Sequence, residues 1–164
     1  MRWLAILLLT APQALAADEP WPFSDVVAAC YSQGNASAEC IGDAATACMD
    51  SDPAQTQTTL GMMFCFLGER DAWDVLLNQE YQKARNFAQS MDEQDREFFP
   101  EYAVRDDQVL AAQRAWIAFR DTNCAMAYGL WGAGSMRQIA GAECMMRMTA
   151  EQTLALRVYQ EHLR

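Results

Sequence analysis

Histidine is nearly absent from this sequence, and no long apolar run follows the first sixteen residues. The one histidine, His162, stands close to the C-terminus, where we expect the chain to fray. A nucleophile activated by histidine and a zinc site built from histidines both need that residue in a fixed position. We therefore expect neither kind of site. The lack of a later apolar run also argues against a membrane-spanning helix after residue 16.

Three further patterns are missing. No two cysteines have the CxxC spacing, which disfavours a thioredoxin-type redox site and a zinc knuckle. The glycines of GLWGAGS, residues 129–135, lack the spacing of a phosphate-binding loop and suit tight turns. The alternation of apolar and polar residues that marks strands is not found either. Methionines within 62–63 and 145–148 could ligate Cu(I), but their helical spacing favours core packing. The sequence thus predicts a helical protein without a cofactor or a metal site.

The first sixteen residues, MRWLAILLLTAPQALA, have the three parts of a secretory signal peptide. Arg2 supplies the positive charge, residues 3–9 the apolar stretch, and residues 14–16 the small side chains of a cleavage site. A membrane anchor is the alternative, but the apolar stretch is too short to span about 30 Å of hydrocarbon. We expect an exported protein, periplasmic or extracellular, that begins near Ala17.

Residues 17–164 have a length that is typical of one domain, and we expect a single helical domain there. This part carries 11 basic and 22 acidic side chains, a net charge of about −11. Such a surface repels nucleic acid and anionic lipid, and it attracts cationic partners. The charge would also keep an exported protein soluble, and charge alone favours this simpler explanation.

An even number of cysteines in an exported chain indicates disulfides. Six cysteines allow many pairings, and the sequence alone does not choose among them. The simplest hypothesis joins neighbours along the chain. Each of these bridges would stabilise the fold by about 3 kcal/mol on the chain-entropy model. The hypothetical pairs are Cys30 with Cys40, Cys48 with Cys65, and Cys124 with Cys144.

Helical periodicity and capping residues predict an all-α fold, a small disulfide-stapled bundle of about four to six helices. Ser24 and Ser37 are expected to cap the first two helices, and Thr149 with Gln152 to form a capping box for the last. Gly61 or Gly68 could interrupt the third. Residues 91–102, a charge-rich stretch with a proline, are the expected linker. The expected helices are about 24–33, 37–49, 55–90, 104–128, 136–146 and 150–163.

Two charged residues lie on helix faces that are otherwise expected to pack. In AAQRAWIAFRDTNC, residues 111–124, Arg120 falls on the packing face, whereas Asp121 falls on the wetter side. Glu80 likewise interrupts an apolar stripe of the preceding long helix. Two arrangements are open: a salt bridge between Glu80 and Arg120 in the core, or both side chains reaching the rim of the bundle. A buried acceptor would make Arg120→Ala cost about 3 kcal/mol. The expected packing faces comprise Ala112, Gln113, Trp116, Phe119, Asn123 and Cys124 around Arg120, and Trp73, Leu77, Ala84 and Phe87 around Glu80.

The run from residue 110 to 156 resembles the conserved half of the LprI-like lysozyme-inhibitor family. Its core is a WxxxRDxxC pattern, here Trp116, Arg120, Asp121 and Cys124, with Cys144 twenty residues further on. The Gly-Ser pair at 134–135 and the TAE triplet at 149–151 also match. One departure is at residues 152–153, where an arginine often follows the triplet.

The upstream part resembles the family more weakly. Asn78 and Tyr81 fit its LNxxY element, and Cys48 and Cys65 fit its earlier cysteine pair. The resemblance covers roughly residues 45–160. The N-terminal segment with two further cysteines looks like an addition. For the Arg120-Asp121 pair a structural role is favoured over contact with a partner.

The resemblance implies a small, exported, disulfide-bonded helical domain whose named activity is inhibition of lysozyme. Lysozymes of the common animal type are strongly basic with an acidic cleft, so an acidic inhibitor would be attracted to them. We expect a binding protein, not an enzyme, with lysozyme or another cationic protein as its partner. An envelope adaptor that binds another protein or peptide is the alternative. A hydrolase with paired carboxylates has less support.

The segment between Cys124 and Cys144 is the expected contact surface. Trp131 would be an amphipathic anchor, Ser135 a polar contact, and Arg137 a fork for carboxylates of the partner. A disulfide at the base of this segment would reduce the entropy lost on binding. Alternatively, Trp131 folds back onto the bundle and the glycines only shape the turn.

Overall fold

A computed structural model describes residues 19–161, and they are almost entirely helical. The proposed signal peptide at 1–16 and His162 lie outside the described residues. The described part of the chain contains no strand, which confirms the all-α prediction. In chain order the elements are α1 (Ser24–Ser32), the 3-10 helix η1 (Gly34–Cys40), α2 (Asp43–Ser51), α3 (Pro53–Thr56), α4 (Thr59–Asp95), the 3-10 helix η2 (Pro100–Tyr102), α5 (Arg105–Gly129) and α6 (Met136–Glu161).

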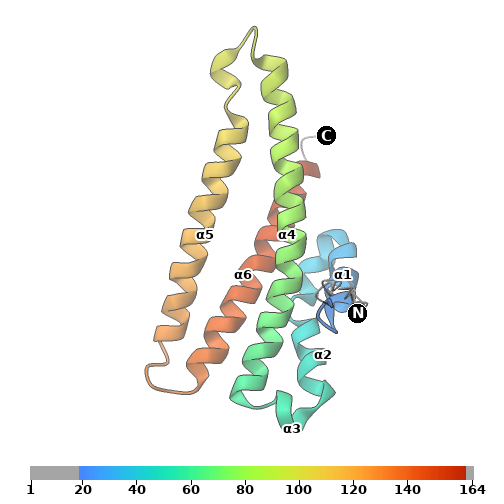
Figure 1. Ribbon diagram of the computed structural model, residues 1–164, viewed down its shortest axis with the longest axis vertical. Coiled ribbons are helices and arrows are strands. Elements are labelled where there is room, and N and C mark those ends of the chain that lie inside the picture. The colour runs from blue at the N-terminus through green and yellow to red at the C-terminus, as the bar shows by residue number, and fades with distance from the viewer. Residues whose placement is uncertain (1–18, 162–164) are drawn as a thin grey trace, which may run out of the picture.

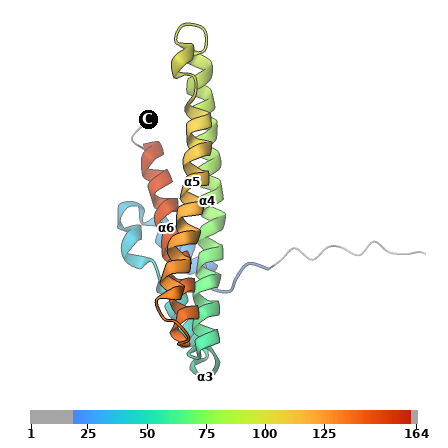
Figure 2. The same ribbon diagram turned by 90° about the vertical axis from the view of Figure 1, so that its left-hand side faces the viewer.

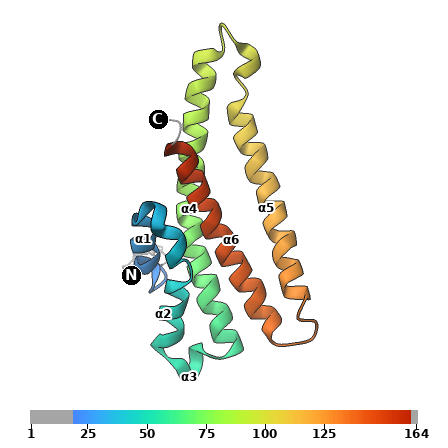
Figure 3. The same cartoon turned by 180° about the vertical axis from the view of Figure 1, so that it is seen from behind.

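Three long helices form the frame of the molecule. The 37-residue α4 and the 25-residue α5 make a long antiparallel hairpin, and α6 lies across one face of it (Figures 1 and 3). Seen from the side, α4 and α5 overlap while α6 stands beside them (Figure 2). α6 packs mainly on α4, and it ends well short of the hairpin tip. The short N-terminal helices cover α4 near its first half.

The three disulfides join neighbours along the chain, as hypothesised. Cys30 pairs with Cys40, Cys48 with Cys65, and Cys124 with Cys144. The first closes α1 and η1 on each other, the second ties α2 to the start of α4, and the third joins α5 to α6. Each bridge therefore holds two helical elements against each other; only the second spans an intervening element, the short α3.

The third predicted helix begins later than expected, and neither glycine interrupts it. Thr58 caps α4, because its hydroxyl accepts a hydrogen bond from the Gly61 amide at 3.0 Å. Residues 53–56 form the separate turn α3. Gly68 lies in unbroken helix, where a Cβ would come within 2.3 Å of the Trp21 ring. Glycine at this position thus serves close packing of an N-terminal indole and does not break the helix.

The predicted break before the last helix is wrong, because α6 is continuous from Met136 to Glu161. Thr149 is fully buried inside the helix, and its hydroxyl donates to the Met145 carbonyl four residues back. Gln152 turns to α5 instead, where its amide donates to Gln113 at 3.1 Å. The residues of the expected capping box therefore lie at helix-helix contacts and cap nothing.

The expected linker is also shorter than predicted, since α4 runs on to Asp95. The carboxylates of Asp92 and Asp95 both accept from the Arg105 guanidinium at the start of α5, at 3.3 and 2.6 Å. These ion pairs hold the charged end of α4 against its neighbour. A charge run that looked like solvated linker is thus part of a helix pair.

The predicted caps of the first two helices are wrong as well. No side chain caps α1, and α2 starts at Asp43, well beyond Ser37. The cap of α2 comes from another helix: the Glu69 carboxylate of α4 accepts the amides of Gly42 and Ala45, both at 2.7 Å. Gly42 has a φ of 103°, a backbone conformation that favours glycine, and so presents its N–H to this carboxylate.

Glu69 is buried, at 1% exposure, and it also accepts a hydrogen bond from the indole of Trp73 at 3.1 Å. Trp73 is the largest fully buried side chain, and Val27, Ala44 and Ala150 pack around it. The Thr153 hydroxyl of α6 reaches the Trp73 carbonyl at 3.4 Å. The core is therefore centred where α1, α2 and α6 meet α4.

We predict that Glu69→Ala destabilises the protein by about 3 kcal/mol, because it leaves two buried N–H donors and one part-buried N–H donor without their acceptor. Urea denaturation followed by far-UV circular dichroism measures this. Glu93→Ala is the matched control, since Glu93 lies on the same helix and is paired with Arg96, with its side chain 76% exposed. The control should stay within about 0.5 kcal/mol of the wild type. Equal stability of the two variants would contradict the role given to Glu69.

Candidate functional site

The turn between α5 and α6 is built from overlapping backbone hydrogen bonds. The Gly132 amide donates to Gly129 at 3.0 Å, and the Gly134 amide to Trp131 at 2.9 Å. Gly132 has a φ of 53°, which a side chain would strain. The glycines of this segment thus shape consecutive tight turns, as the sequence indicated.

This end of the molecule exposes several large apolar side chains. Leu130 is 79% and Trp131 50% exposed, so Trp131 does not fold fully back onto the bundle. Ser135 is exposed beside them. Exposed apolar groups concentrated at a braced turn are typical of interaction sites. We call the set Met126, Tyr128, Leu130, Trp131 and Met136 the turn surface; all five side chains are at least 41% exposed.

Arg137 contacts the turn from the start of α6. Its guanidinium lies over the Tyr128 ring, with Cζ 5.6 Å from the ring centre, and donates to the Gly132 carbonyl at 3.4 Å. Its Nε is buried without a hydrogen-bond partner in the described part of the chain. The side chain therefore lies against its own loop, and only part of the guanidinium faces outward as the expected fork.

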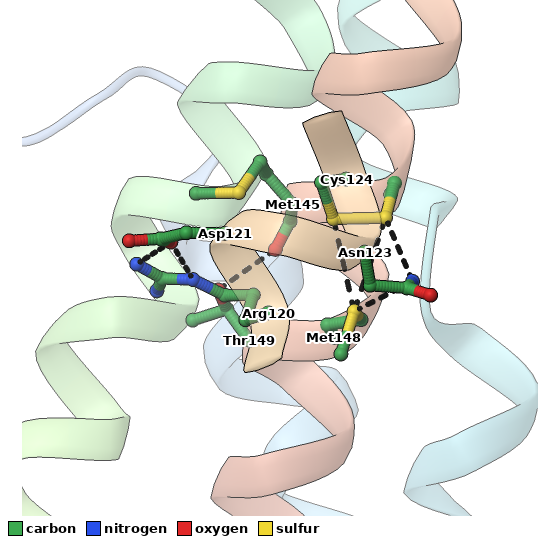
Figure 4. The surroundings of a disulfide bond; sticks show 8 residues. Arg120, Asp121, Asn123, Cys124, Met145, Met148 and Thr149 are labelled. Carbon is green, nitrogen blue, oxygen red and sulfur yellow. Dashed lines mark hydrogen bonds and ion pairs between the residues drawn. A yellow bond between two sulfur atoms is a disulfide. The ribbon is translucent and has the colours of Figure 1, made fainter. Parts of the chain in front are cut away.

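The third disulfide joins α5 to α6 on the two sides of this turn, between Cys124 and Cys144 (Figure 4). The thioether of Met148 packs on it, 3.7 Å from the Cys124 sulfur and 3.8 Å from the Cys144 sulfur. The Asn123 amide donates to the same thioether at 3.3 Å. Methionine fills the space beside the bridge, as its expected role in packing requires.

The hypothetical salt bridge between Glu80 and Arg120 does not form. Arg120 instead pairs with its neighbour Asp121 at 2.9 Å and stacks over Trp116, with Cζ 5.0 Å from the ring centre. Figure 4 shows the Arg120-Asp121 pair on one flank of α5 and the disulfide on the other. The Arg120 side chain is 15% exposed and that of Asp121 is 56% exposed. The guanidinium thus reaches the rim, whereas Glu80 is buried at 3% exposure, so neither of the two arrangements holds for the pair.

Glu80 is buried and binds a side chain of the N-terminal helix α1. Its carboxylate accepts from the Tyr31 hydroxyl and from Lys83, both at 2.6 Å. Tyr31 in turn lies under the Arg157 guanidinium of α6, and its carbonyl accepts from that group at 2.5 Å. The acid in the apolar stripe therefore joins α1, α4 and α6.

The packing face of α5 is narrower than the sequence indicated. Gln113 and Cys124 are buried, and Trp116 and Asn123 are half-buried. Ala112 is exposed, and Phe119 is 62% exposed, although both were expected to pack. Only α4 and α6 flank this helix, so a single strip of it is covered. The predicted stripe of α4 is more accurate, with Trp73, Leu77 and Ala84 buried and Phe87 half-buried.

The LNxxY residues act near the middle of α4. Asn78 is exposed and bonds locally to Asp74. The Tyr81 hydroxyl accepts from the Arg85 guanidinium at 3.1 Å, and Arg85 forms an ion pair with Asp106 of α5. Tyr81 therefore orients an arginine that links the two helices of the hairpin. Sequence reasoning missed Arg85, although it stands one helical turn after Tyr81.

Asp92 caps α5 from α4, another contact that the sequence did not reveal. It accepts the amides of Arg105 and Asp106, both at 3.0 Å. Burial alone would raise the pKa of the Asp92 carboxyl, but these amides and the Arg105 guanidinium outweigh burial and lower it. Hydrogen bonds from Arg85 and Gln89 also lower the pKa of Asp106. Both carboxylates thus favour the charged form in the folded protein.

No group of three or more histidine, cysteine, aspartate or glutamate side chains in residues 19–161 could hold a metal ion. Within the same residues, no helix combines the length and the apolar character needed to cross a bilayer. The turn surface is the candidate site that fits the expected contact region.

Fold and site define a class: small helical proteins, clamped by disulfides, that present an apolar turn. The chain belongs to the family described as lysozyme inhibitor LprI, whose model matches residues 48–156. The match leaves out α1, η1 and the first disulfide. The family is one of inhibitors, and it supports a lysozyme-inhibitor-like role at family level.

An uncharacterized protein of Rhizobium meliloti (strain 1021) is similar to this chain. The two are 26% identical over 112 residues, which cover 68% of this chain and 81% of that protein. No solved structure is significantly similar to the chain.

Arg120→Ala should destabilise the protein by about 1 kcal/mol, because it removes packing on Trp116 and a half-exposed ion pair. The value of about 3 kcal/mol that a buried acceptor would give is not expected. Thermal or urea denaturation measures the change. Arg114→Ala on the exposed side of α5 is the control. A loss as large as that of Glu69→Ala would mean that Arg120 has a buried partner after all.

Acid should weaken the α4–α5 hairpin through Asp92 and Asp106. Because the pKa of each is lower in the folded state, their contribution is fully present above the unfolded-state pKa of about 3.9. It is lost as the pH falls through the lower folded-state values. Asp92→Asn should therefore flatten the fall in unfolding free energy between about pH 5 and pH 2. Asp50→Asn, an exposed position on α2, should keep the wild-type pH dependence. Identical slopes in wild type and Asp92→Asn would refute this.

Proposed function

We propose that this protein inhibits a lysozyme by pressing the turn surface against the enzyme. The single observation that supports this most is the exposed Trp131, held between a row of tight turns and the Cys124–Cys144 bridge. Membership of the lysozyme inhibitor LprI family gives the class of target. The proposal also takes the protein to be exported, as the first sixteen residues indicate.

Trp131 and Leu130 would supply the buried centre of such a contact. Aromatic anchors surrounded by smaller contacts carry most of the binding energy in protein interfaces. The turn is already fixed in the free protein, so little conformational entropy is lost on binding. Ser135 would add a polar contact at the edge. Arg137 mainly holds the turn in shape, and its outward N–H groups would approach a carboxylate of the enzyme.

Net charge would direct the encounter. The chain has a formal net charge of −10 at pH 7, and a basic lysozyme would be attracted over distances longer than direct contact. The association rate should therefore fall as salt is added. The apolar anchor should instead govern how slowly the complex dissociates.

The test is the inhibition constant of wild type, Trp131→Ala and Arg137→Ala against lysozyme acting on cell-wall substrate. We expect Trp131→Ala to weaken inhibition by at least about tenfold, which is about 1.4 kcal/mol. We expect a smaller effect for Arg137→Ala, because that side chain is folded against its own loop. Circular dichroism establishes that both variants are folded.

Phe98→Ala is the matched control, since Phe98 is 72% exposed at the opposite end of the hairpin. It should leave the inhibition constant unchanged. Undiminished lysis with a several-fold molar excess of wild type would exclude inhibition of that lysozyme. Inhibition that Phe98→Ala weakens and Trp131→Ala does not would place the contact at the other end.

A further inference from the structure

An apolar groove opens between α4 and α5 where α6 ends. The hairpin continues past the last described turn of α6, so its upper part consists of two helices only (Figures 1 and 3). A cavity of about 480 Å³ lies in the groove. It is lined by Ala84, Phe87, Ala88, Met91, Arg105, Gln108, Val109, Ala112, Gln113, Gln152 and Leu156.

The lining shows what kind of ligand would fit. Small alanines at 84, 88 and 112 leave room beside the larger Phe87 and Met91. Two side chains of α6, Gln152 and Leu156, close the lower end. A helix placed in this groove would lie beyond the end of α6 and give the upper hairpin the third helix that the lower part has. Grooves between helices accept the apolar face of an amphipathic helix in this way.

The charge of the upper hairpin, whose one charged groove-lining residue is Arg105, indicates which charge the outer face of such a helix should carry. Residues 85–109, which form the upper hairpin, contain seven acidic and three basic side chains, a net charge of −4. All three arginines are engaged: Arg85 with Asp106, Arg96 with Glu93, and Arg105 with Asp92 and Asp95. The upper hairpin therefore keeps an excess of negative charge on its acidic side chains. It would attract lysine and arginine on the partner and repel a second copy of this chain.

We propose that this groove binds a basic amphipathic helix of another protein or peptide, with the apolar face of the helix against Phe87, Met91 and Val109. This is a second interaction site, independent of the proposed lysozyme contact. Ala112 precedes Leu130 by 18 positions, which corresponds to roughly 27 Å along a helix. One molecule has room for both partners.

A fluorescein-labelled Lys/Leu peptide of about 18 residues, designed as an amphipathic helix, is the probe. Its binding to the full chain is measured by fluorescence anisotropy, at low and at high salt. Ala112→Trp fills the groove from an exposed position, and Ala111→Trp places the same side chain on exposed α5 surface outside the lining. We expect Ala112→Trp to weaken binding by at least about tenfold and Ala111→Trp to change it by less than about twofold.

Two control peptides test the chemistry of the partner. A Glu/Leu helix should not bind, and a scrambled Lys/Leu sequence without an apolar face should bind far more weakly than the probe. Equal binding of the probe to the two tryptophan variants would reduce the interaction to general charge attraction and overturn the proposal. So would equal binding of the scrambled peptide.

Other occupants give different results, each of which overturns the proposal. Dimers in light scattering that disappear with Ala112→Trp would make a second copy the occupant. Much tighter binding by a chain that ends at Glu161 would make the chain's own last residues the occupant. Inhibition of lysozyme by Ala112→Trp should equal that of wild type. A result that overturns peptide binding in the groove therefore leaves the proposed lysozyme contact untouched. A result against the lysozyme contact likewise leaves the groove proposal untouched.

Discussion

The carboxylate of Glu69 is the contact on which the arrangement of the N-terminal half depends. A buried charge must be hydrogen-bonded, and here the donors are the first amides of α2 and the indole of Trp73. This requirement fixes where α2 begins, and it makes Gly42 adopt a positive φ. The Trp73 carbonyl also accepts a hydrogen bond from the Thr153 hydroxyl of α6. Hydrogen bonds therefore connect α2 through α4 to the last helix.

Two carboxylates on α4, one near each end, accept the free backbone amides at the start of a neighbouring helix. Glu69 caps α2 near the start of the helix, and Asp92 caps α5 near its end. Each replaces the local serine or threonine cap that a helix often carries, so both neighbours are oriented by tertiary contacts. The long helix thus acts as the common support. The turn surface stands at the far end of α5, clamped by its own disulfide and independent of both caps.

Much of the architecture could be predicted from the sequence, because helical periodicity and cysteine order are local signals. The all-α class, the buried stripe of α4 and the three neighbouring disulfides are confirmed. The capping box at Thr149 was wrong because a buried threonine can satisfy its hydroxyl within its own helix. The caps from Glu69 and Asp92 could not be found, since the amides they accept from are 24 to 27 and 13 to 14 positions away. Assigning Arg120 required knowing which neighbours α5 has.

For the candidate site, the exposure of the predicted residues is known, and their contact with a partner stays a prediction. Trp131 and Ser135 are exposed at a braced turn, as the glycines and flanking cysteines indicated. The inward position of Arg137 depends on the Tyr128 ring, which no spacing rule revealed.

The disulfide order has a further consequence for biogenesis. A chain that emerges N-terminus first presents each cysteine's partner before the next pair appears. Oxidation of each pair in order of emergence would therefore form the native bridges without disulfide exchange.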